Sequence, residues 1–237
     1  MAAGGRPGRT TAPAAHWEYS GAAGPGHWGS LDPGYRRCAD GSAQSPVALV
    51  HPERVPLPDL GFGYHPGGAV VQDTGHTVQA DFPPGSTLTL DGRDYALRQV
   101  HFHVPAEHEV EGTSYPAEMH FVHQADGGDL AVVAAFVETS EGGDHPAWQR
   151  LLDAFPDGTA DGVDPAALLR PDRTSIRYHG SLTTPPCREG VRWNVLAQPL
   201  RLSRRQVARL RARYPHNRRP LQRRNGRRLL LDSSDGD

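Results

Sequence analysis

The sequence contains no lysine, because all 25 of its basic residues are arginine. This absence excludes any mechanism that needs a lysine amine, including Schiff-base chemistry and the phosphate-binding P-loop. No apolar run approaches the roughly 20 residues of a membrane-spanning helix, so we expect no membrane span. Residues 1–15 have no apolar signal core and are expected to be a disordered lead-in, and residues 232–237 a flexible acidic tail.

Cysteine is scarce as well. The two cysteines, Cys38 and Cys187, lie far apart in the chain, so no CxxC metal or redox pair exists. The residues alone leave two alternatives open: one long-range disulfide, or two unrelated thiols.

Acidic residues are missing from one long segment. Residues 201–228 contain 12 arginines and no Asp or Glu, whereas the net charge of the whole chain is only −2. Such a segment could bind nucleic acid or an acidic surface. We favour the alternative of a helix and an edge strand whose arginines are solvated or paired with the acidic remainder, and we expect no nucleic-acid partner.

Turn-forming residues are plentiful, with 27 glycines and 22 prolines among 237 residues. Short alternating apolar runs bounded by glycine, proline or aspartate predict strands, mostly antiparallel. No linker interrupts residues 16–231, so we expect one predominantly β (α+β) domain there, built on a large, mostly antiparallel central sheet. The predicted strands are Thr77–Phe82, Thr87–Leu90, Tyr95–Val104, Ala117–Val122, Leu130–Val137, Ile176–Ser181 and Val191–Leu200.

Helix signals are few, and the predicted helices are short and peripheral. Pro146–Phe155 is one candidate. Asp164 as an N-cap, with proline at the first helical position, begins another. Ser203 caps a third helix that runs to about Tyr214.

One cluster stands out among the 13 histidines. Alternate side chains of a strand share a face, so His101 and His103 are expected to project together from one strand. The next strand repeats the pattern with Glu118 and His120. An antiparallel return would place His120 beside the first two histidines.

Three imidazoles on two neighbouring strands can occupy three corners of a tetrahedron. Zinc with three protein ligands and an open fourth position is the catalytic arrangement. We therefore predict that these three histidines bind Zn2+, with Glu118 accepting the second N–H of His120. His108 in the connecting loop and His123 on the opposite face are expected to lie outside the cluster.

The segment QVHFHVPAEHEVEGTSYPAEMHFVH resembles the metal-binding core of the exported, bacterial-type α-class carbonic anhydrases. By this similarity His101, His103 and His120 are the zinc ligands, and the activity is reversible hydration of CO2 to bicarbonate and a proton. Zinc lowers the pKa of its bound water to about 7 in such enzymes. Other segments resemble the family in the same order: HWGSLD, CADGSAQSPV, DTGHTVQADF, LAVVAAFVE, YHGSLTTPPCREGVRWNVL and NRRPLQRRNGR.

The resemblance gives Thr183 and Glu107 a joint catalytic role. The Thr183 hydroxyl would accept a hydrogen bond from the nucleophile and donate one to Glu107, because an ionised carboxylate can only accept. Without the family, the first is a loop hydroxyl and the second a solvated acid. The resemblance also implies a cis bond between Pro185 and Pro186.

The family also has an apolar wall for CO2 beside the metal. Without the resemblance, the matching side chains would be taken as ordinary core. Thr184 and Gln99 would line the rim of this cavity. The residues that match the wall are Val122, Val132, Leu182, Val191 and Trp193.

His76 matches the family's proton shuttle, a role that suits an imidazole with a pKa near 6.5. Without the family it is a surface histidine at a strand entrance. Tyr19 matches the tyrosine that orders the relay waters. Thr74 and Gln79 stand where many members carry asparagine, so the water network is expected to differ.

Exported members of the family pair cysteines at the positions of Cys38 and Cys187. The resemblance therefore implies a disulfide and a periplasmic or secreted protein. It also implies binding of CO2 or bicarbonate, inhibitory anions and sulfonamides; a homodimer is compatible with the sequence. The alternative function is a catalytically impaired relative acting as a binding module, but such relatives lose zinc histidines that are all present here.

Overall fold

The computed structural model describes residues 15–233, so most of the predicted lead-in and tail lies outside the described residues. Fourteen strands account for most of the regular structure. Their bounds are β1 Ala48–Leu49, β2 Glu53–Val55, β3 Gly61–Gly63, β4 Gly67–Asp73, β5 Val78–Asp81, β6 Thr87–Leu90, β7 Arg93–His103, β8 Glu109–Val110, β9 Ala117–Gln124, β10 Leu130–Ser140, β11 Gly158–Val163, β12 Ser175–Ser181, β13 Glu189–Ser203 and β14 Leu230–Asp232.

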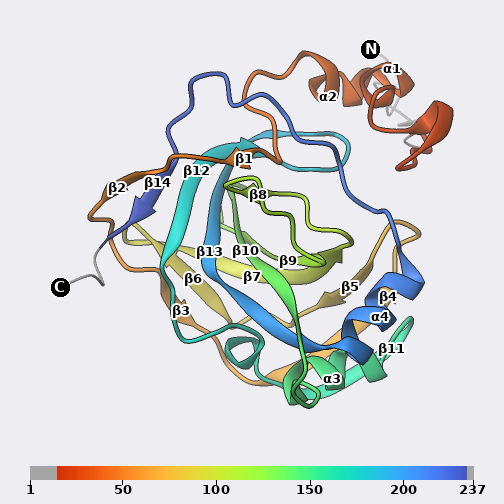
Figure 1. Cartoon of the computed structure of the whole chain (residues 1–237), viewed down its shortest axis with the longest axis vertical. Helices are drawn as coiled ribbons and strands as arrows, with labels where there is room; N and C mark the ends of the chain where they lie inside the picture. Colours follow the sequence, from red (N-terminus) through yellow and green to blue (C-terminus); the bar gives the residue numbers. More distant parts are fainter. Residues whose placement is uncertain (1–14, 234–237) are drawn as a thin grey trace, which may run out of the picture.

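Twelve of these strands form one central sheet (Figure 1). Its main path runs β11-β4-β5-β7-β9-β10-β13-β12-β14-β2, with β6 paired to β7 and β3 paired to β6. Neighbours are antiparallel except β10 with β13 and β14 with β2. Strands β1 and β8 form a separate parallel pair. The predicted fold, a predominantly β domain with a mostly antiparallel central sheet, is confirmed.

The helices are short, as predicted. They are α1 Trp28–Leu31, α2 Arg37–Asp40, α3 Pro146–Asp153 and α4 Arg204–Arg213, with 3-10 turns at Gly21–Ala23, Pro33–Tyr35 and Pro165–Leu168. Figure 1 shows α1 and α2 at one end of the molecule and α3 and α4 at the other. No helix in residues 15–233 is long and apolar enough to cross a membrane.

Apolar side chains cover both faces of the sheet. On one face, Phe102 and Phe121 belong to a large core that includes Trp148 of α3 and Leu210 of α4. The opposite face carries a second core that contains Val132, Val195 and other apolar residues. The candidate histidines project from this second face.

Half of the twelve arginines of residues 201–228 are paired with acids of the rest of the chain. Arg201, Arg204, Arg205, Arg209, Arg213 and Arg228 each form an ion pair with an Asp or Glu from residues 53–153. Arg219 is buried among backbone carbonyls. The predicted helix is present as α4, but the predicted edge strand is not: residues 201–203 end the interior strand β13, and residues 214–228 are irregular.

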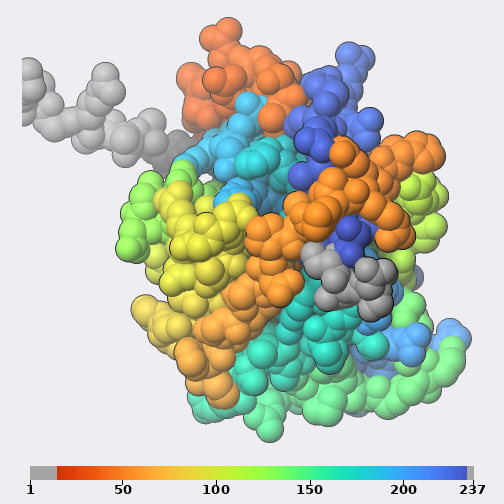
Figure 2. Space-filling view, turned by 90° about the vertical axis from the view of Figure 1, so that its left-hand side faces the viewer, coloured from red at the N-terminus to blue at the C-terminus, as the bar shows by residue number. Residues whose placement is uncertain are grey.

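The C-terminal strand corrects one predicted boundary. Asp232, assigned from the sequence to a flexible tail, is the last residue of β14 and pairs with Arg177 at 2.9 Å. Strand β14 adds to β12 and β2, so the end of the described chain is held in the sheet. Figure 2 shows the orange segment that contains β2 beside the blue C-terminal segment.

Candidate metal centre

His101 and His103 lie at the end of β7, and His120 lies on the adjacent β9. His101 and His120 are direct partners in the antiparallel ladder, and His103 is opposite Glu118. Because paired residues project from the same face of a sheet, the register brings the three imidazoles together. Their candidate ligand nitrogens all lie within 4.8 Å of one another.

Each imidazole has one nitrogen bound to a fixed partner. His101 Nδ1 lies 2.8 Å from Gln99 Oε1, and His103 Nδ1 donates to the Asn217 carbonyl at 2.6 Å. His120 Nε2 donates to Glu118 Oε1 at 2.8 Å. Since these partners are acceptors, the nitrogens bound to them carry the protons.

The remaining nitrogens therefore present three lone pairs to one point. The His101 and His103 Nε2 atoms are 3.0 Å apart, although neither carries a proton to share. Burial is the main cause that lowers the pKa of all three imidazoles, to about 4 for His103. Neutral, convergent imidazoles match the donor set of a zinc ion with three protein ligands.

His108, which we expected to lie outside the cluster, is part of it. It is fully buried, with Nδ1 2.7 Å from Glu118 Oε1 and Nε2 2.7 Å from the Tyr178 hydroxyl. Burial alone raises the pKa of Glu118, but His108 and His120 together lower it well below its usual value. His108 therefore fixes the carboxylate that orients His120. No periodic signal could have indicated this, because residues 105–108 form a loop.

Glu107 lies beside the histidines on the same loop and is buried. Its Oε1 accepts the backbone N–H of Arg219 at 2.8 Å, and Oε2 lies 3.5 Å from His103 Nε2. Burial raises the pKa of Glu107 to about 7, against lowering effects that include its interaction with the Thr183 side chain. Oε2 has no well-formed hydrogen bond within the described residues. Thr183 and Glu107 are thus brought together, with one carboxylate oxygen available.

Asn217 was not singled out in the sequence, yet it connects several parts of the site. Its backbone carbonyl holds His103, and its side-chain Oδ1 accepts the N–H of Val104 at 2.7 Å. Its side-chain amide donates to the carbonyls of His76 and Phe102. It lies within the resembling segment NRRPLQRRNGR, which was the only available signal.

The five residues predicted to form the CO2 wall, and Thr184 at its rim, lie on the histidine face or in the neighbouring loop. Val122 is paired with Val132, two positions from the His120–Ala134 pair. Val132, Val191 and Trp193 are buried in the same core, and Val122 and Leu182 pack against it. Thr184 is half-buried at the loop that follows β12.

His76 lies at the N-terminal side of the site and contacts Trp17. The two rings stack with centroids 3.7 Å apart, and His76 Nε2 donates to the Trp17 carbonyl at 2.7 Å. The Tyr19 ring approaches the His76 ring edge-on, with the two ring centroids 6.4 Å apart. Burial, followed by the Glu107 charge, raises the pKa of Tyr19 well above its usual value.

The Thr183 loop is fixed at its C-terminal side. Cys187 is joined to Cys38 in a disulfide with a Cα–Cα distance of 5.0 Å, which confirms the predicted pairing. The Pro185–Pro186 peptide bond is cis, as predicted. The Cys38 carbonyl also accepts a hydrogen bond from the Arg219 guanidinium at 3.0 Å, which connects the disulfide to the segment that holds Glu107.

Comparisons with known proteins agree with this geometry. A family model described as eukaryotic-type carbonic anhydrase matches residues 23–232. A carbonic anhydrase of Pectobacterium carotovorum is 38% identical over 223 residues, covering 91% of this chain and 90% of the relative. A carbonic anhydrase of Nostoc sp. is 36% identical and covers 91% and 85%.

The solved structures give the same result. The α-carbonic anhydrase of Thermovibrio ammonificans, in complex with the inhibitor sulfanilamide, superposes with a TM-score of 0.87. It is 36% identical, and the match covers 91% of this chain and 99% of that one. The sheet, the histidine cluster and these relatives agree, and the chain belongs to the α-class carbonic anhydrases, a family of enzymes whose general reaction is the hydration of CO2.

Proposed function

We propose that this chain catalyses the zinc-dependent, reversible hydration of CO2 to bicarbonate and a proton. The observation that carries the proposal is the convergence of three neutral imidazole nitrogens whose partner nitrogens are all bound to acceptors. Zinc held by His101, His103 and His120 would supply a water activated as a nucleophile at neutral pH. Orientation of the nucleophile, binding of CO2 and transfer of the proton are assigned to side chains of the protein.

Thr183 and Glu107 orient the nucleophile. Glu107 can only accept when it is ionised, and a zinc cation held beside it would favour the ionised form. The Thr183 hydroxyl would then donate to it and present a lone pair on its other side. This lone pair of Thr183 would accept a hydrogen bond from the nucleophile and so orient it toward the substrate. The free Oε2 of Glu107 supports this arrangement, because it leaves an acceptor for the hydroxyl.

The apolar wall binds CO2 and excludes competing water. Val122, Val132, Leu182, Val191 and Trp193 are apolar and adjacent to the histidine face, while Thr184 and Gln99 supply polar groups at its rim. CO2 has no net charge or dipole, so it needs an apolar surface rather than a hydrogen-bonding pocket. This leaves the polar groups free to act on the nucleophile and the product.

Each turnover releases one proton, and we assign its transfer to His76. The half-buried imidazole is positioned by Trp17, whose carbonyl binds Nε2, and its second ring nitrogen would relay the proton. Tyr19 would order water between His76 and the metal centre. Thr74 and Gln79 are directed to other groups, the Thr77 carbonyl and Asp81, so they do not act here as the asparagines of other members do.

We further propose that sulfonamides and small anions inhibit the enzyme, as sulfanilamide does for the Thermovibrio relative. Export to the periplasm or outside the cell is supported by the disulfide, because such bonds persist in oxidising compartments. The competing function, a binding module without catalysis, is disfavoured by the complete set of three ligands.

The deciding experiment is stopped-flow CO2 hydration together with zinc analysis. We expect one zinc per chain, loss of activity after chelation and recovery on adding zinc. His120→Ala should lose activity and zinc, whereas His123→Gln, on the same strand but the opposite face, should retain both. A zinc-loaded wild-type protein without hydration activity would show that the chain is a binding module.

A further inference from the structure

A second cavity lies behind the metal centre on the same face of the sheet. It has a volume of about 450 Å3. We call it the rear pocket. Its lining contains no zinc-ligand candidate and no residue of the CO2 wall. The residues that line it are His51, Pro52, Arg54, Val110, Glu111, Tyr115, Phe136, Ile176, Val195, Leu196, Ala197 and Leu231.

The register of the sheet places this pocket next to the metal centre. Phe136 is the direct partner of Glu118 on the β9–β10 ladder. Val195 is the partner of Ala134, which is itself opposite His120. The floor of the rear pocket is therefore on the strand adjacent to Glu118, the carboxylate that orients the candidate metal ligand His120.

The floor of the pocket is apolar and closely packed, and its accessible apolar surface comes from the partly exposed Val110, Tyr115 and Leu231. Phe136 and Val195 are each 1% exposed and Ile176 is 5% exposed. Tyr115 stacks on Phe136 with ring centroids 4.6 Å apart, and closes one side. A volume of this size with apolar walls and a few polar groups is typical of small-molecule sites.

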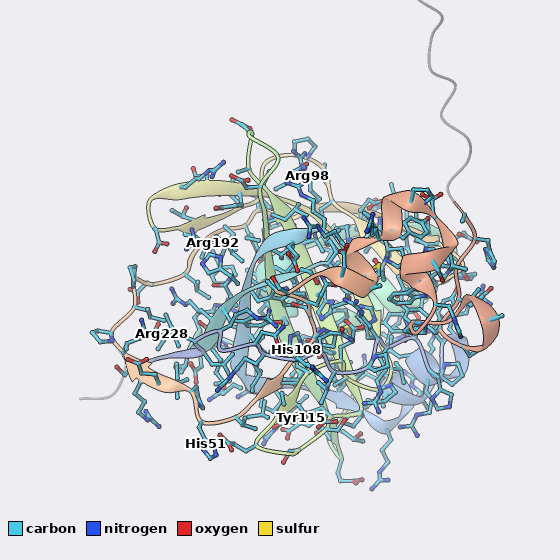
Figure 3. The ribbon with its side chains drawn as sticks, turned by 90° about the horizontal axis from the view of Figure 1, so that it is seen from above. His51, Arg98, His108, Tyr115, Arg192 and Arg228 are labelled. Carbon is cyan, nitrogen blue, oxygen red and sulfur yellow. A yellow bond between two sulfur atoms is a disulfide. The ribbon has the colours of Figure 1, made fainter. Side chains whose placement is uncertain are left out.

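The rim of the pocket is preformed by two residues with left-handed backbone. His51 and Glu111 have φ values of 49° and 45°, a conformation that is uncommon for residues other than glycine. The His51 N–H donates to Glu111 Oε1 at 2.8 Å, and the Glu111 N–H donates to the Leu49 carbonyl at 3.3 Å. Figure 3 shows His51 and Tyr115 towards one margin of the molecule, with His108 farther inside.

The polar groups at the rim favour an anionic head group. Within residues 15–233, the Arg54 guanidinium has no ion pair or hydrogen bond, and the His51 imidazole has no hydrogen bond. Glu111, the one carboxylate of the lining, already accepts the His51 N–H. Two side-chain donors are thus available, and one oxygen of the Glu111 carboxylate is already bound. An arginine side chain matches the geometry of a carboxylate.

We propose that the rear pocket binds a small monocarboxylate with an apolar body, its chain packed on Val110, Tyr115 and Leu231 and its carboxylate paired with Arg54. The cavity volume of about 450 Å3 accommodates an aliphatic chain of about eight carbons. The proposal concerns binding and does not depend on the hydration activity.

The test is isothermal titration of the purified full chain with octanoate, 1-octanol, octylamine and acetate. We expect octanoate to bind with a Kd of about 1 mM or tighter. Acetate should bind much more weakly because it lacks the apolar body, and octylamine because it lacks the anionic head. Octanol should bind with an affinity between those of octanoate and acetate.

Substitutions at two exposed positions of the pocket, Arg54 and Ala197, test the carboxylate contact and the apolar contact separately. Arg54→Gln should weaken octanoate binding about tenfold and leave octanol binding unchanged, because it removes only the charged partner. Ala197→Trp, which fills the pocket from its exposed rim, should weaken both. Arg211→Gln, an exposed arginine on α4, controls for the loss of one positive charge.

Three results would overturn the proposal. The first is no heat of binding at millimolar octanoate. The second is octanoate binding that is equal in wild type, Arg54→Gln and Ala197→Trp, which would place the ligand elsewhere, for example at the metal centre. The third is tighter binding of octylamine than of octanoate, which would show that Glu111 binds a cationic head group at the rim.

Discussion

His101 and His120 face each other across the β7–β9 ladder with ring centroids 5.1 Å apart and ring planes at 90°. The perpendicular arrangement allows Nε2 of one ring and Nδ1 of the other to converge, while the second nitrogens point to Gln99 and Glu118. The geometry is thus set by backbone register and by two acceptors.

Thr183→Val should remove the hydroxyl without changing the volume of the side chain. We expect kcat/KM for CO2 hydration to fall about 100-fold, because the nucleophile loses its orienting acceptor. Zinc content should stay at one per chain, since Thr183 holds none of the ligands. The matched control is Thr159→Val, at an exposed threonine of β11, which should keep kcat/KM within a few-fold of wild type. Equal rates for the two variants would remove Thr183 from the mechanism.

His76→Ala should slow turnover at low buffer concentration by about tenfold or more, while the interconversion of CO2 and bicarbonate, measured by isotope exchange, stays near wild type. Added imidazole should restore much of the rate, because it can carry the same proton. His16→Ala is the control, since His16 is an exposed histidine whose ring lies 6.1 Å from His76. Unchanged turnover of His76→Ala at low buffer would assign the relay to another group.

The sequence correctly predicted the features that depend on the two-residue periodicity of a strand. Thr87–Leu90 has its predicted bounds as β6, and the two-residue spacing of His101 and His103 correctly placed both on one face. The predicted antiparallel return also holds, because residues 104–116 connect neighbouring strands. Local patterns were sufficient for these features.

The features that were missed depend on contacts between distant segments. Strands β4 and β11 contain several glycines and acidic residues, and form because they pair with each other. His108 and Asn217 lie in irregular segments, so nothing in their spacing indicates that they hold Glu118 and His103. The disulfide could be assigned only through the family resemblance, because two cysteines have no pattern.

The double variant Cys38→Ser/Cys187→Ser should be less stable than wild type by about 4 kcal/mol. The bond closes a loop with a sequence separation of 149, and the chain-entropy model assigns up to roughly 4–5 kcal/mol to a loop of that length. Urea unfolding measures the difference. Thiol titration of the denatured, unreduced wild type should detect no free thiol; two thiols in protein made under oxidising conditions would contradict the bond and the argument for export.

The buried His123 should make stability depend on pH. Its Nε2 lies 2.6 Å from the Tyr64 hydroxyl, and burial lowers the pKa of His123 from 6.5 to about 3. The unfolded chain therefore binds a proton below pH 6.5 that the folded chain does not bind until about pH 3. Stability from this group is complete above pH 6.5 and falls as the pH drops towards 3.

His123→Gln removes this titration and keeps a polar group within reach of Tyr64. Between pH 7 and pH 5, wild type should lose about 2 kcal/mol more free energy of unfolding than the variant, because one extra proton binds the unfolded state over about 1.5 pH units. Urea unfolding of both proteins at each pH measures the difference, and all other titrating groups cancel in the comparison. A wild-type-to-variant difference that stays constant over this range would show that His123 is not buried as a neutral imidazole.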